Sequence, residues 1–455
     1  MTLKIAVVGN GYVGTVVAAC FARVGHRVVG LEADAAKLGQ LRQGRAPFFE
    51  AGLDALLAEG LRSGQLRFTA DPVEAVADCD VVFLCVGTPP GTDGRPDMAA
   101  TLEAATAVGG ALRRHHVVVT KSTVPIGSGR WLASVVEDAL SAQIAAESSF
   151  SVVSNPEFLR QGSAIGDFLH PDRVVIGSDD PRALDVVAQV YAPIVDQAFS
   201  GSNGHRPPLV RTNLATAETI KYASNAFLAT KISFINELAN ICERVGADVT
   251  DMVTAMGLDP RIGGRHLDPG VGWGGSCFGK DLAALVATAE EYGYEASILK
   301  AAVAVNARQR TRVVEKLQGH LRSLRGRRLG VLGLAFKPGT DDLRDAPSVD
   351  IISRLLISGA LVTAHDPVVK HLPGFADVRL VERPEEVADR ADAVILVTEW
   401  PEYLALDFDR LRSRMRGDLF IDGRNLFDPV TVSHAGLVYD GFGRSLLRQG
   451  VDARS

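Results

Sequence analysis

The chain has 455 residues, of which 47% are apolar and 22% are charged, and its formal net charge is −6. At roughly 150 residues per domain this length predicts about three domains, and the composition argues against collagen-like and nucleic-acid-binding classes. Five cysteines are an odd number spread thinly over the chain, unlike the dense, even set of a disulfide-stapled secreted domain. We therefore expect a cytoplasmic protein with reduced thiols.

Residues 3–24 predict a buried strand, a glycine turn and a helix. The run IAVV precedes Gly9, Gly11 and Gly14, which have the G-x-G-x-x-G spacing, and an Ala/Val-rich helical pattern follows. This reading accounts for residues 5–22, which approach the length of a membrane span. The glycines permit a tight turn, and a helix N-terminus offers N–H groups to a pyrophosphate. This segment therefore predicts dinucleotide binding.

Glu32 ends the second predicted strand, at about the 20-residue offset at which a carboxylate hydrogen-bonds a ribose diol. A 2′-phosphate would be repelled there, so Glu32 favours NAD over NADP, unless it is only a solvated carboxylate at a strand end. Further apolar runs at 79–89, 117–125 and 151–158 end in polar residues. This is the arrangement of parallel strands that meet a ligand at their carboxyl ends.

A long helical pattern covers residues 213–256, and within it Lys221 and Asn225 lie four apart, so they share one helix face. A second α/β unit begins near Arg327. Its segment ADAVILVTEWP resembles CDVVFLCVGTP of the first unit, but the glycine fingerprint is lacking. We predict an α/β fold with two Rossmann-like, doubly wound parallel-sheet domains joined by a long helical connector. The predicted domains are an NAD-binding domain at 1–205, a helical connector with a cysteine loop at 206–310, and a second Rossmann-like domain at 311–455.

The segment RIGGRHLDPGVGWGGSCFGKD, residues 261–281, contains seven glycines around Cys277. This density favours a loop that approaches a ligand closely. The ammonium group of Lys280 would raise the thiolate fraction that nucleophilic catalysis requires. The alternative is a small buried side chain, which is our interpretation of Cys20, Cys79, Cys85 and Cys242. The histidines and cysteines lack metal-ligand spacing, so no metal site is expected.

Together these motifs resemble the nucleotide-sugar 6-dehydrogenase family (the UDP-glucose/GDP-mannose dehydrogenase family) over nearly the whole chain. The resemblance rests on GNGYVG, FEAGL, CVGTP, KSTVP, NPEFLRQGSA, IKYASNAFLATKISFINE, RIGG…GGSCFGKD, LAFKPGTDDLRDAPS, DGRNLFDP and YDGFGR, in that order. RIG before the cysteine and phenylalanine after it are closer to the UDP-glucose branch than to the GDP-mannose or N-acetylmannosamine branches. The resemblance implies four-electron oxidation of the C6 hydroxyl of UDP-glucose to UDP-glucuronate with two NAD+, through a thiohemiacetal and a thioester on the cysteine. It also implies that 311–455 binds the nucleotide sugar.

The resemblance implies specific site residues. The catalytic set is Cys277 as nucleophile, Lys221 and Asn225 as oxyanion partners, Asp281 and Thr123 for the hydrolytic water, and Glu157 as acid/base. The cofactor set is Gly9, Gly11, Tyr12, Val13, Gly14, Glu32, Lys37, Thr88, Thr123, Lys280 and Arg344. The substrate set is Glu157, Phe158, Leu159, Lys221, Asn225, Arg261, Gly274, Lys337 and Arg424. In the family Arg261 can reach a neighbouring subunit, which implies a homodimer.

Several alternatives remain open at this point. Lys221 could be a solvated helix residue, Thr123 a turn hydroxyl and Glu157 a helix cap, while the basic residues could form surface salt bridges. The sequence also departs from the family pattern at Ala51, Gln161, His266, Trp273 and Gly279, and His266 and Trp273 bear on substrate identity. Alternative functions are the same chemistry on dTDP-glucose or another nucleotide hexose, a two-electron alcohol or hydroxyacid dehydrogenase, and a non-catalytic NAD-sensing module.

Overall fold

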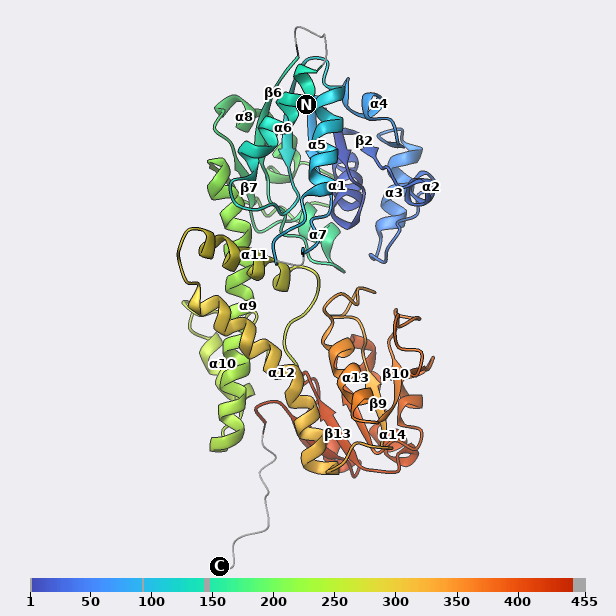
Figure 1. Cartoon of the computed structure of the whole chain (residues 1–455). Coiled ribbons are helices and arrows are strands. Elements are labelled where there is room, and N and C mark those ends of the chain that lie inside the picture. Colours follow the sequence, from blue (N-terminus) through green and yellow to red (C-terminus); the bar gives the residue numbers. More distant parts are fainter. Residues whose placement is uncertain (1, 92–93, 143–147, 445–455) are drawn as a thin grey trace, which may run out of the picture. The chain divides into compact units, whose positions relative to one another are not determined.

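The computed structural model describes residues 2–91, 94–142 and 148–444. The chain forms two compact units, one of residues 1–224 with 283–293 and one of residues 225–282 with 294–455. Each unit contains its own β-sheet (Figure 1). The predicted division into three domains at residues 205 and 310 stays a prediction.

The sheet of the first unit has eight strands in the order β3-β2-β1-β4-β5-β6-β7-β8. Its strands are β1 (Lys4–Val8), β2 (Arg27–Leu31), β3 (Leu66–Thr69), β4 (Val81–Leu84), β5 (His115–Thr120), β6 (Ser149–Ser154), β7 (Val174–Gly177) and β8 (Leu209–Thr212). Strands β1 to β6 pair in parallel, whereas β7 is antiparallel to β6 and parallel to β8. The first six strands have the order of a doubly wound dinucleotide-binding sheet.

Helices cover both faces of this sheet, because successive residues of a strand point to opposite sides. In β1, Ile5 and Val7 pack into a core with α1, α3 and α8, while Ala6 and Val8 pack into a second core with α4, α5 and α6. The helices of this unit are α1 (Tyr12–Arg23), α2 (Ala35–Arg42), α3 (Leu53–Arg62), α4 (Pro72–Val76), α5 (Ala99–Ala111), α6 (Ser128–Ser141), α7 (Ala164–Leu169) and α8 (Pro181–Val195).

The predicted helical stretch at 213–256 contains two helices rather than one. Helix α9 (Leu214–Val245) ends at Gly246, whose φ of 75° is unfavourable for other residues. Helix α10 (Val249–Gly257) then begins after Asp248, whose side chain accepts the N–H of Thr250. A glycine end and a new cap thus interrupt the apolar pattern that runs through both helices.

The sheet of the second unit has the order β11-β10-β9-β12-β13-β14, and all its strands pair in parallel. Its strands are β9 (Arg328–Leu332), β10 (Leu361–His365), β11 (Arg379–Leu380), β12 (Ala393–Leu396), β13 (Leu419–Asp422) and β14 (Val438–Gly441). This order repeats that of the first six strands of the other sheet. Strand β12 takes the place of β4, which explains why their sequences resemble each other. The predicted fold class is therefore confirmed.

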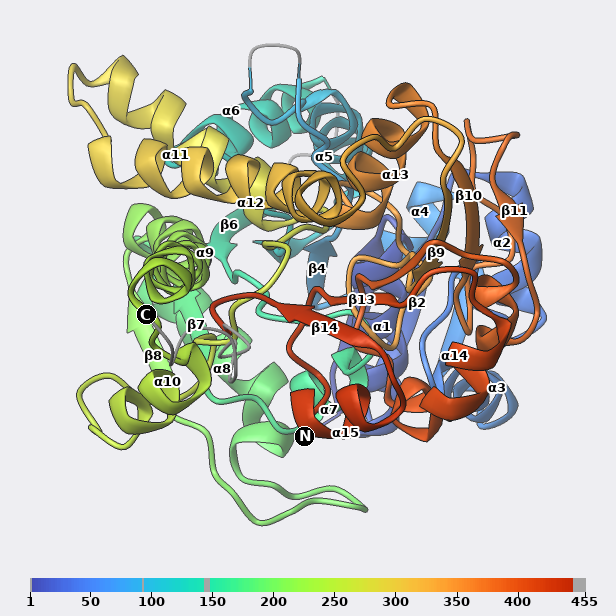
Figure 2. The same ribbon diagram turned by 90° about the horizontal axis from the view of Figure 1, so that it is seen from below.

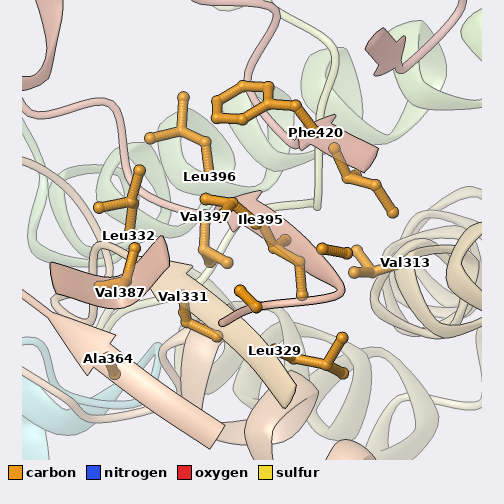
Figure 3. Close-up of a cluster of buried hydrophobic side chains, with 14 of the residues drawn as sticks. Val313, Leu329, Val331, Leu332, Ala364, Val387, Ile395, Leu396, Val397 and Phe420 are labelled. Atoms are coloured by element: carbon orange, nitrogen blue, oxygen red, sulfur yellow. The ribbon is translucent and has the colours of Figure 1, made fainter. Parts of the chain in front are cut away.

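The core of the second unit lies on both faces of this sheet (Figure 3). Val331 and Ile395 come from the central strands, and Val313 comes from the long helix α12. The helices of this unit are α10, α12 (Ser297–Leu321), α13 (Pro347–Ile357), α14 (Phe408–Arg414) and α15 (Pro429–His434), with the second half of α9, the first turn of α11 (Phe278–Glu291), and 3-10 turns at Pro384–Ala388 and Pro401–Ala405.

In the second unit α9 and α12 lie side by side (Figure 2). Ser233 of α9 donates its hydroxyl hydrogen to the carbonyl oxygen of Ala302, and Asn240 donates an amide hydrogen to Gln309. This polar seam provides the side chains that support the cysteine loop. Within the described ranges no helix is both long and apolar enough to cross a membrane.

Candidate active site

The turn after β1 gives each glycine of GNGYVG a different environment. Gly9 has φ 84°, and a Cβ there would lie 2.6 Å from Cγ1 of Val86. A Cβ on Gly14 would overlap the carbonyl oxygen of Gly9, so Gly14 allows α1 to pack closely on the turn. At Gly11, the N-cap of α1, the Cβ position is open toward the rest of the described chain. This open space, beside the N–H groups that begin α1, fits a pyrophosphate.

Glu32 directly follows β2 and is held by backbone donors. Its Oε2 accepts the N–H of Asn10 at 2.9 Å, and its Oε1 accepts the N–H of Asp34 at 2.9 Å. The side chain is buried, so the alternative of a freely solvated carboxylate is wrong. Because Asn10 belongs to the glycine turn, the carboxylate lies beside the proposed pyrophosphate position. These residues fit a dinucleotide whose ribose carries a free diol.

Thr88 follows β4 and Thr123 follows β5, at the carboxyl edge of the sheet. The hydroxyl group of Thr88 donates to the carbonyl oxygen of Thr123 at 2.7 Å, which ties the two strand-end turns together. Val13 is half-buried in the first turn of α1. Lys37 is exposed in the first turn of α2, with its Nζ 4.0 Å from Asp34. Thr88 and Thr123 thus lie on one edge with the glycine turn.

Tyr12 connects the glycine turn to a loop that follows β6. Its hydroxyl group donates to Glu50, which is buried. The carboxylate of Glu50 also accepts the N–H groups of Gly162 at 2.6 Å and Ala164 at 2.9 Å. Sequence reasoning noted the FEAGL motif but missed this role of its glutamate. Glu50 holds the NPEFLRQGSA segment against the start of α1.

Glu157 and Lys221 form a buried ion pair in the first unit. Nζ of Lys221 lies 2.8 Å from Oε1 of Glu157, and the N–H of Leu159 donates to Oε2 at 2.6 Å. Burial opposes ionisation of Glu157, but the charge and hydrogen bond of Lys221 and the Leu159 N–H hold its pKa below the usual range. Lys221 is therefore not a solvated helix residue. Glu157 is not a helix cap either, since the next helix starts at residue 164.

Sequence reasoning missed two cations near this pair. The guanidinium group of Arg173 lies over the ring of Phe158, 3.7 Å from its centroid, and Lys221 lies 5.5 Å from the same centroid. Lys121, the first residue after β5, is buried and bonds to Asn155. The position of Lys121 in KSTVP, directly after a strand, was a usable signal, whereas no pattern marks Arg173.

The cysteine loop of the second unit is fixed from both sides. Asn306 of α12 accepts the N–H of Trp273 at 2.8 Å and donates to its carbonyl oxygen at 2.9 Å. Arg310 also donates to that carbonyl oxygen, at 3.0 Å. The buried indole N–H of Trp273 donates to Ser233 of α9. Trp273, which the sequence analysis linked to substrate identity, therefore supports the loop.

The glycines of this loop approach protein atoms, which the sequence analysis did not anticipate. A Cβ on Gly272 would lie 2.5 Å from Oδ1 of Asn306, and one on Gly275 would lie 2.6 Å from the ring of Phe336. A Cβ on Gly274 would overlap the carbonyl oxygen of Asp345. Close packing within the protein therefore explains these glycines, and it holds the segment before Cys277 in one path.

Cys277 differs from the other four cysteines, all of which lie in the described ranges. Cys277 is exposed, whereas Cys20, Cys79, Cys85 and Cys242 are buried. Burial raises the pKa of each of those thiols, to about 12 for Cys79 and Cys85. Cys277 immediately precedes α11, and its Sγ lies 3.8 Å from the hydroxyl oxygen of Ser276. N–H groups at a helix N-terminus favour an anion.

Asn225 and Lys280 converge on Asp281, one turn after Cys277. Nδ2 of Asn225 donates to Oδ2 of Asp281 at 2.6 Å, and Nζ of Lys280 lies 2.7 Å from Oδ1. Asp281 is almost completely buried, with an exposed fraction of 1%. The ammonium group that sequence reasoning assigned to thiol activation thus also binds the carboxylate beside the thiol.

The predicted basic residues of the second unit have different surroundings. Arg424 follows β13 and donates to the carbonyl oxygens of Val397 at 2.8 Å and Gly272 at 3.2 Å, so it joins the cysteine loop to the sheet. Lys337 is half-buried after β9, beside the ring of Phe336. The two other arginines are exposed and pair with aspartates two residues before them. These pairs are Arg261 with Asp259 and Arg344 with Asp342, each at 2.6 Å.

Arg344 also lies close enough to Cys277 for their charges to interact. Sequence reasoning placed this arginine near the cofactor phosphates, and it did not connect it with the thiol. The pairing of Arg261 and Arg344 with aspartates agrees with the salt-bridge alternative, but an exposed pair contributes little free energy and can exchange its partner for a ligand.

The second sheet repeats the dinucleotide turn but fills it with protein atoms. Gly333 follows β9 with φ 90°, as Gly9 follows β1. Asp366 directly follows β10, as Glu32 follows β2, but its carboxylate accepts five N–H groups, from Leu334, Ala335, Val368, Val369 and the indole of Trp400. A carboxylate offers about four lone-pair positions, so none remains for a ribose. Asp366 therefore does not offer, within the described part of the second unit, a ribose site of the Glu32 type.

These features define the class of the protein. The first unit has an open glycine turn, a backbone-held acidic residue and the 3-2-1-4-5-6 strand order, which are features of a dinucleotide-dependent oxidoreductase. The exposed cysteine of the second unit narrows this class to oxidoreductases that could use a thiol nucleophile.

Comparison with known proteins identifies the family. Residues 3–195, 215–308 and 330–429 match the NAD binding, central and UDP binding domains of the UDP-glucose/GDP-mannose dehydrogenase family. The UDP-glucose 6-dehydrogenase of Pseudomonas aeruginosa is 43% identical over 97% of this chain and 98% of that protein, and that of Rhizobium meliloti is 44% identical over 97% and 100%. The structure of a UDP-glucose dehydrogenase from Pyrobaculum islandicum matches with TM-score 0.87 and 40% identity over 98% of each chain.

The chain therefore belongs to the UDP-glucose/GDP-mannose dehydrogenase family of NAD-dependent oxidoreductases. The predicted family, enzyme class and cofactor are confirmed.

Proposed function

We propose that the protein oxidises the C6 hydroxyl group of UDP-glucose to a carboxylate, in two NAD-dependent steps, through a thioester on Cys277. The observation that carries this proposal is the exposed thiol of Cys277 before α11, in a chain whose relatives are named UDP-glucose 6-dehydrogenases. Oxidation of an alcohol to an aldehyde needs no nucleophile. The second oxidation does, because the aldehyde carbon must gain a bond before it can lose another hydride.

The first oxidation uses the Glu157–Lys221 pair. NAD+ is the acceptor of the hydride in both oxidations. The ionised Glu157 carboxylate accepts the O6 proton while Lys221 and Asn225 stabilise the developing negative charge on O6. C6 then loses a hydride and becomes an aldehyde carbon. The ion pair at 2.8 Å supports this assignment, since it keeps Glu157 ready to accept a proton.

The second oxidation uses Cys277. Its thiolate adds to the aldehyde carbon, and the carbonyl oxygen takes a proton to give a thiohemiacetal. That proton returns to Glu157 as C6 loses its second hydride, which leaves a thioester. Glu157 releases its proton to solvent. Water ordered by Asp281 and Thr123 then attacks the thioester carbon and gives one proton to the departing sulfur and one to solvent as the C–S bond breaks, so the products are the carboxylate and the free thiol. The hydrogen bond of Asn225 to the buried Asp281 supports a fixed water position.

The basic residues of the second unit are proposed to bind the nucleotide sugar. Arg424, Lys337 and Arg261 supply cationic groups suited to a diphosphate, and Gly274 places backbone beside the sugar. Phe158 and Leu159 are also proposed to contact the sugar. Arg344 binds the NAD phosphates in this assignment, and its interaction with Cys277 adds a second role in favouring the thiolate.

We also propose that the protein is a cytoplasmic homodimer. An exposed apolar stripe on α9 supports the dimer: Phe227, Phe234, Ile241 and Val245 recur at seven and four residues, and their exposed fractions are 66%, 49%, 47% and 69%. Helix positions at this spacing lie on one face. In a dimer, Arg261 would serve the site of the neighbouring subunit.

A substrate panel tests the proposed function. Purified protein is mixed with excess NAD+ and limiting UDP-glucose, dTDP-glucose or GDP-mannose, and NADH is measured per sugar. We expect two NADH per UDP-glucose. If dTDP-glucose also gave two NADH, and with a higher kcat/KM than UDP-glucose, the nucleotide base of the substrate would be thymine. The two bases differ by one methyl group, which apolar contacts discriminate weakly. A yield of one NADH would indicate a two-electron dehydrogenase, and no NADH with any sugar would favour a sensor.

A further inference from the structure

Lys121 occupies a closed, buried cage at the carboxyl end of β5. Its Nζ donates to Oδ1 of Asn155 and to the hydroxyl oxygen of Tyr191, each at 3.0 Å. The Tyr191 hydroxyl in turn donates to the same Asn155 oxygen at 2.6 Å, which closes a triangle. The rings of Phe168 and Tyr191 lie 5.8 and 5.6 Å from Nζ. The direct partners of this ammonium group are thus neutral.

The cage connects Lys121 to the catalytic pair through two residues of chain. The side-chain amide of Asn155 donates to the carbonyl oxygen of Val175 at 2.7 Å. Its backbone N–H donates to the carbonyl oxygen of Thr120 at 2.9 Å. These two hydrogen bonds fix the position of Asn155. Glu157 lies two residues later and holds Lys221. The four hydrogen bonds of Asn155 therefore set where the Glu157 turn begins.

Charge connects the same groups. The ionisable groups that face Lys121 are Cys85 after β4, Tyr191 on α8, Glu157 after β6 and Lys221 on α9. Burial lowers the pKa of Lys121 to about 8, although Cys85 and Glu157 oppose this shift. At neutral pH the lysine is still charged, and its charge contributes to the low pKa of Glu157.

A buried lysine whose direct partners are neutral opposes folding while it is charged. Because its folded-state pKa lies below its unfolded value, the unfolded state binds more protons between about pH 8 and the ordinary lysine value. Its unfavourable contribution is therefore complete below pH 8 and is lost as the pH rises above it. A buried charge with neutral direct partners lowers the free energy of unfolding, so a contribution to stability does not explain this lysine.

We propose that Lys121 is a positioning residue for Glu157: its hydrogen bond to Asn155 fixes the turn from Asn155 to Glu157, and its buried ammonium charge acts on the Glu157 carboxylate in addition to that of Lys221. This inference rests on the proposed acid/base role of Glu157. Lys121 itself does not exchange a proton with the substrate in this account. Its effect on turnover passes through the position and the ionisation of Glu157.

The test compares Lys121→Met, which removes the charge, with Tyr191→Phe, which removes the two hydrogen bonds of the Tyr191 hydroxyl and keeps the charge. The pH midpoint of the Glu157 carboxyl group is measured by carbon NMR on glutamate-labelled apoprotein, and Glu157→Gln identifies its signal. We expect the midpoint to rise in Lys121→Met and to rise by less in Tyr191→Phe, in which the lysine charge remains. The acid limb of kcat/KM should move by the same amount.

An unchanged Glu157 midpoint in folded Lys121→Met would overturn the inference, as would an equal rise in Tyr191→Phe. If Lys121→Met does not fold, Lys121→Gln decides, because the neutral amide can still donate a hydrogen bond to Asn155 while the positive charge is removed. The midpoint should rise there too, and a constant midpoint would again overturn the inference. The midpoint needs no turnover, so a wild-type protein without NADH formation would refute the proposed function separately.

Discussion

Gly11 and Gly14 belong to one motif but have different roles, which an added methyl group at each position would distinguish. Both belong to GNGYVG, but the Cβ position is open at Gly11 and occupied by the Gly9 carbonyl oxygen at Gly14. The first glycine therefore leaves room for a ligand, while the second leaves room for the protein.

This difference predicts opposite outcomes for Gly11→Ala and Gly14→Ala. We expect Gly11→Ala to fold with a melting temperature near that of wild type and to bind NAD about tenfold more weakly, a loss of about 1.4 kcal/mol. We expect Gly14→Ala to lose about 1–3 kcal/mol of stability through overpacking. Calorimetric titration and thermal unfolding measure the two effects, and full NAD affinity in Gly11→Ala would contradict the assignment.

At the same scale, the sequence indicated the residues whose role depends on local order, such as Gly9, Glu32 and Cys277. It did not indicate residues whose role depends on a distant partner. Glu50 meets Gly162 across 112 positions, and Asn306 meets Trp273 across 33. Periodicity and motif spacing carry no information on such pairs. Lys121 is an intermediate case, because its place at a strand end was visible but its buried cage was not.

At the scale of elements, α12 fixes the cysteine loop by hydrogen bonds to both the N–H and the carbonyl group of one loop residue. Asn306 both donates to and accepts from the backbone of Trp273, four residues before Cys277. Asn240 lies in the same α9–α12 seam, but it donates to the side chain of Gln309 and not to the backbone of the loop. The two asparagines therefore form a matched pair.

We expect Asn306→Ala to lower stability by about 1–3 kcal/mol, because two buried backbone groups lose their partner. We also expect kcat to fall by about tenfold to a hundredfold, because the thiol is displaced from its reacting position. Asn240→Ala should reduce stability while kcat stays near the wild-type value. Thermal unfolding measures the change in stability, and steady-state kinetics measure the change in kcat. An unchanged kcat in Asn306→Ala would contradict the proposal that the hydrogen bonds of Asn306 to Trp273 position the thiol.

The apolar stripe of α9 predicts the effect of a charge on assembly. Phe234→Glu should weaken the proposed dimer more than tenfold, since burial of a phenylalanine side chain contributes about 2 kcal/mol. Leu404→Glu, at an exposed apolar position on another element, serves as the control. Sedimentation velocity distinguishes monomer from dimer. A dimer that persists in Phe234→Glu would show that α9 is not the interface.

At the scale of the whole molecule, the two sheets share one order over six strands, but the turns after β1 and β9 differ, and we expect the two sheets to bind different ligands for that reason. Alternation of apolar runs and turn residues predicted both sheets, and the likeness of residues 79–89 and 391–401 predicted the repeat. The antiparallel β7 and its neighbour β8 escaped prediction, because each has only four residues and β8, at the edge of the sheet, includes the polar residues Arg211 and Thr212. The Asp366 cage escaped because its donors come from three separate segments.

This difference between the sheets predicts one NAD per chain. Glu32 accepts two N–H groups and retains free lone pairs, whereas Asp366 is saturated. Isothermal titration of the protein with NAD should therefore fit one site per chain, both in the absence of nucleotide and with UDP present. A second NAD site that persists in Gly11→Ala would contradict the assignment of the second unit.

The central claim is that Cys277 carries the second oxidation, and the NADH yield of Cys277→Ser tests it most directly. The variant and wild type are each incubated with excess NAD+ and limiting UDP-glucose, and Cys79→Ser, whose hydroxyl can keep the hydrogen bond to Ala75, is the control. We predict two NADH per sugar for wild type and the control, and at most one for Cys277→Ser. Two NADH per sugar from Cys277→Ser would contradict the account.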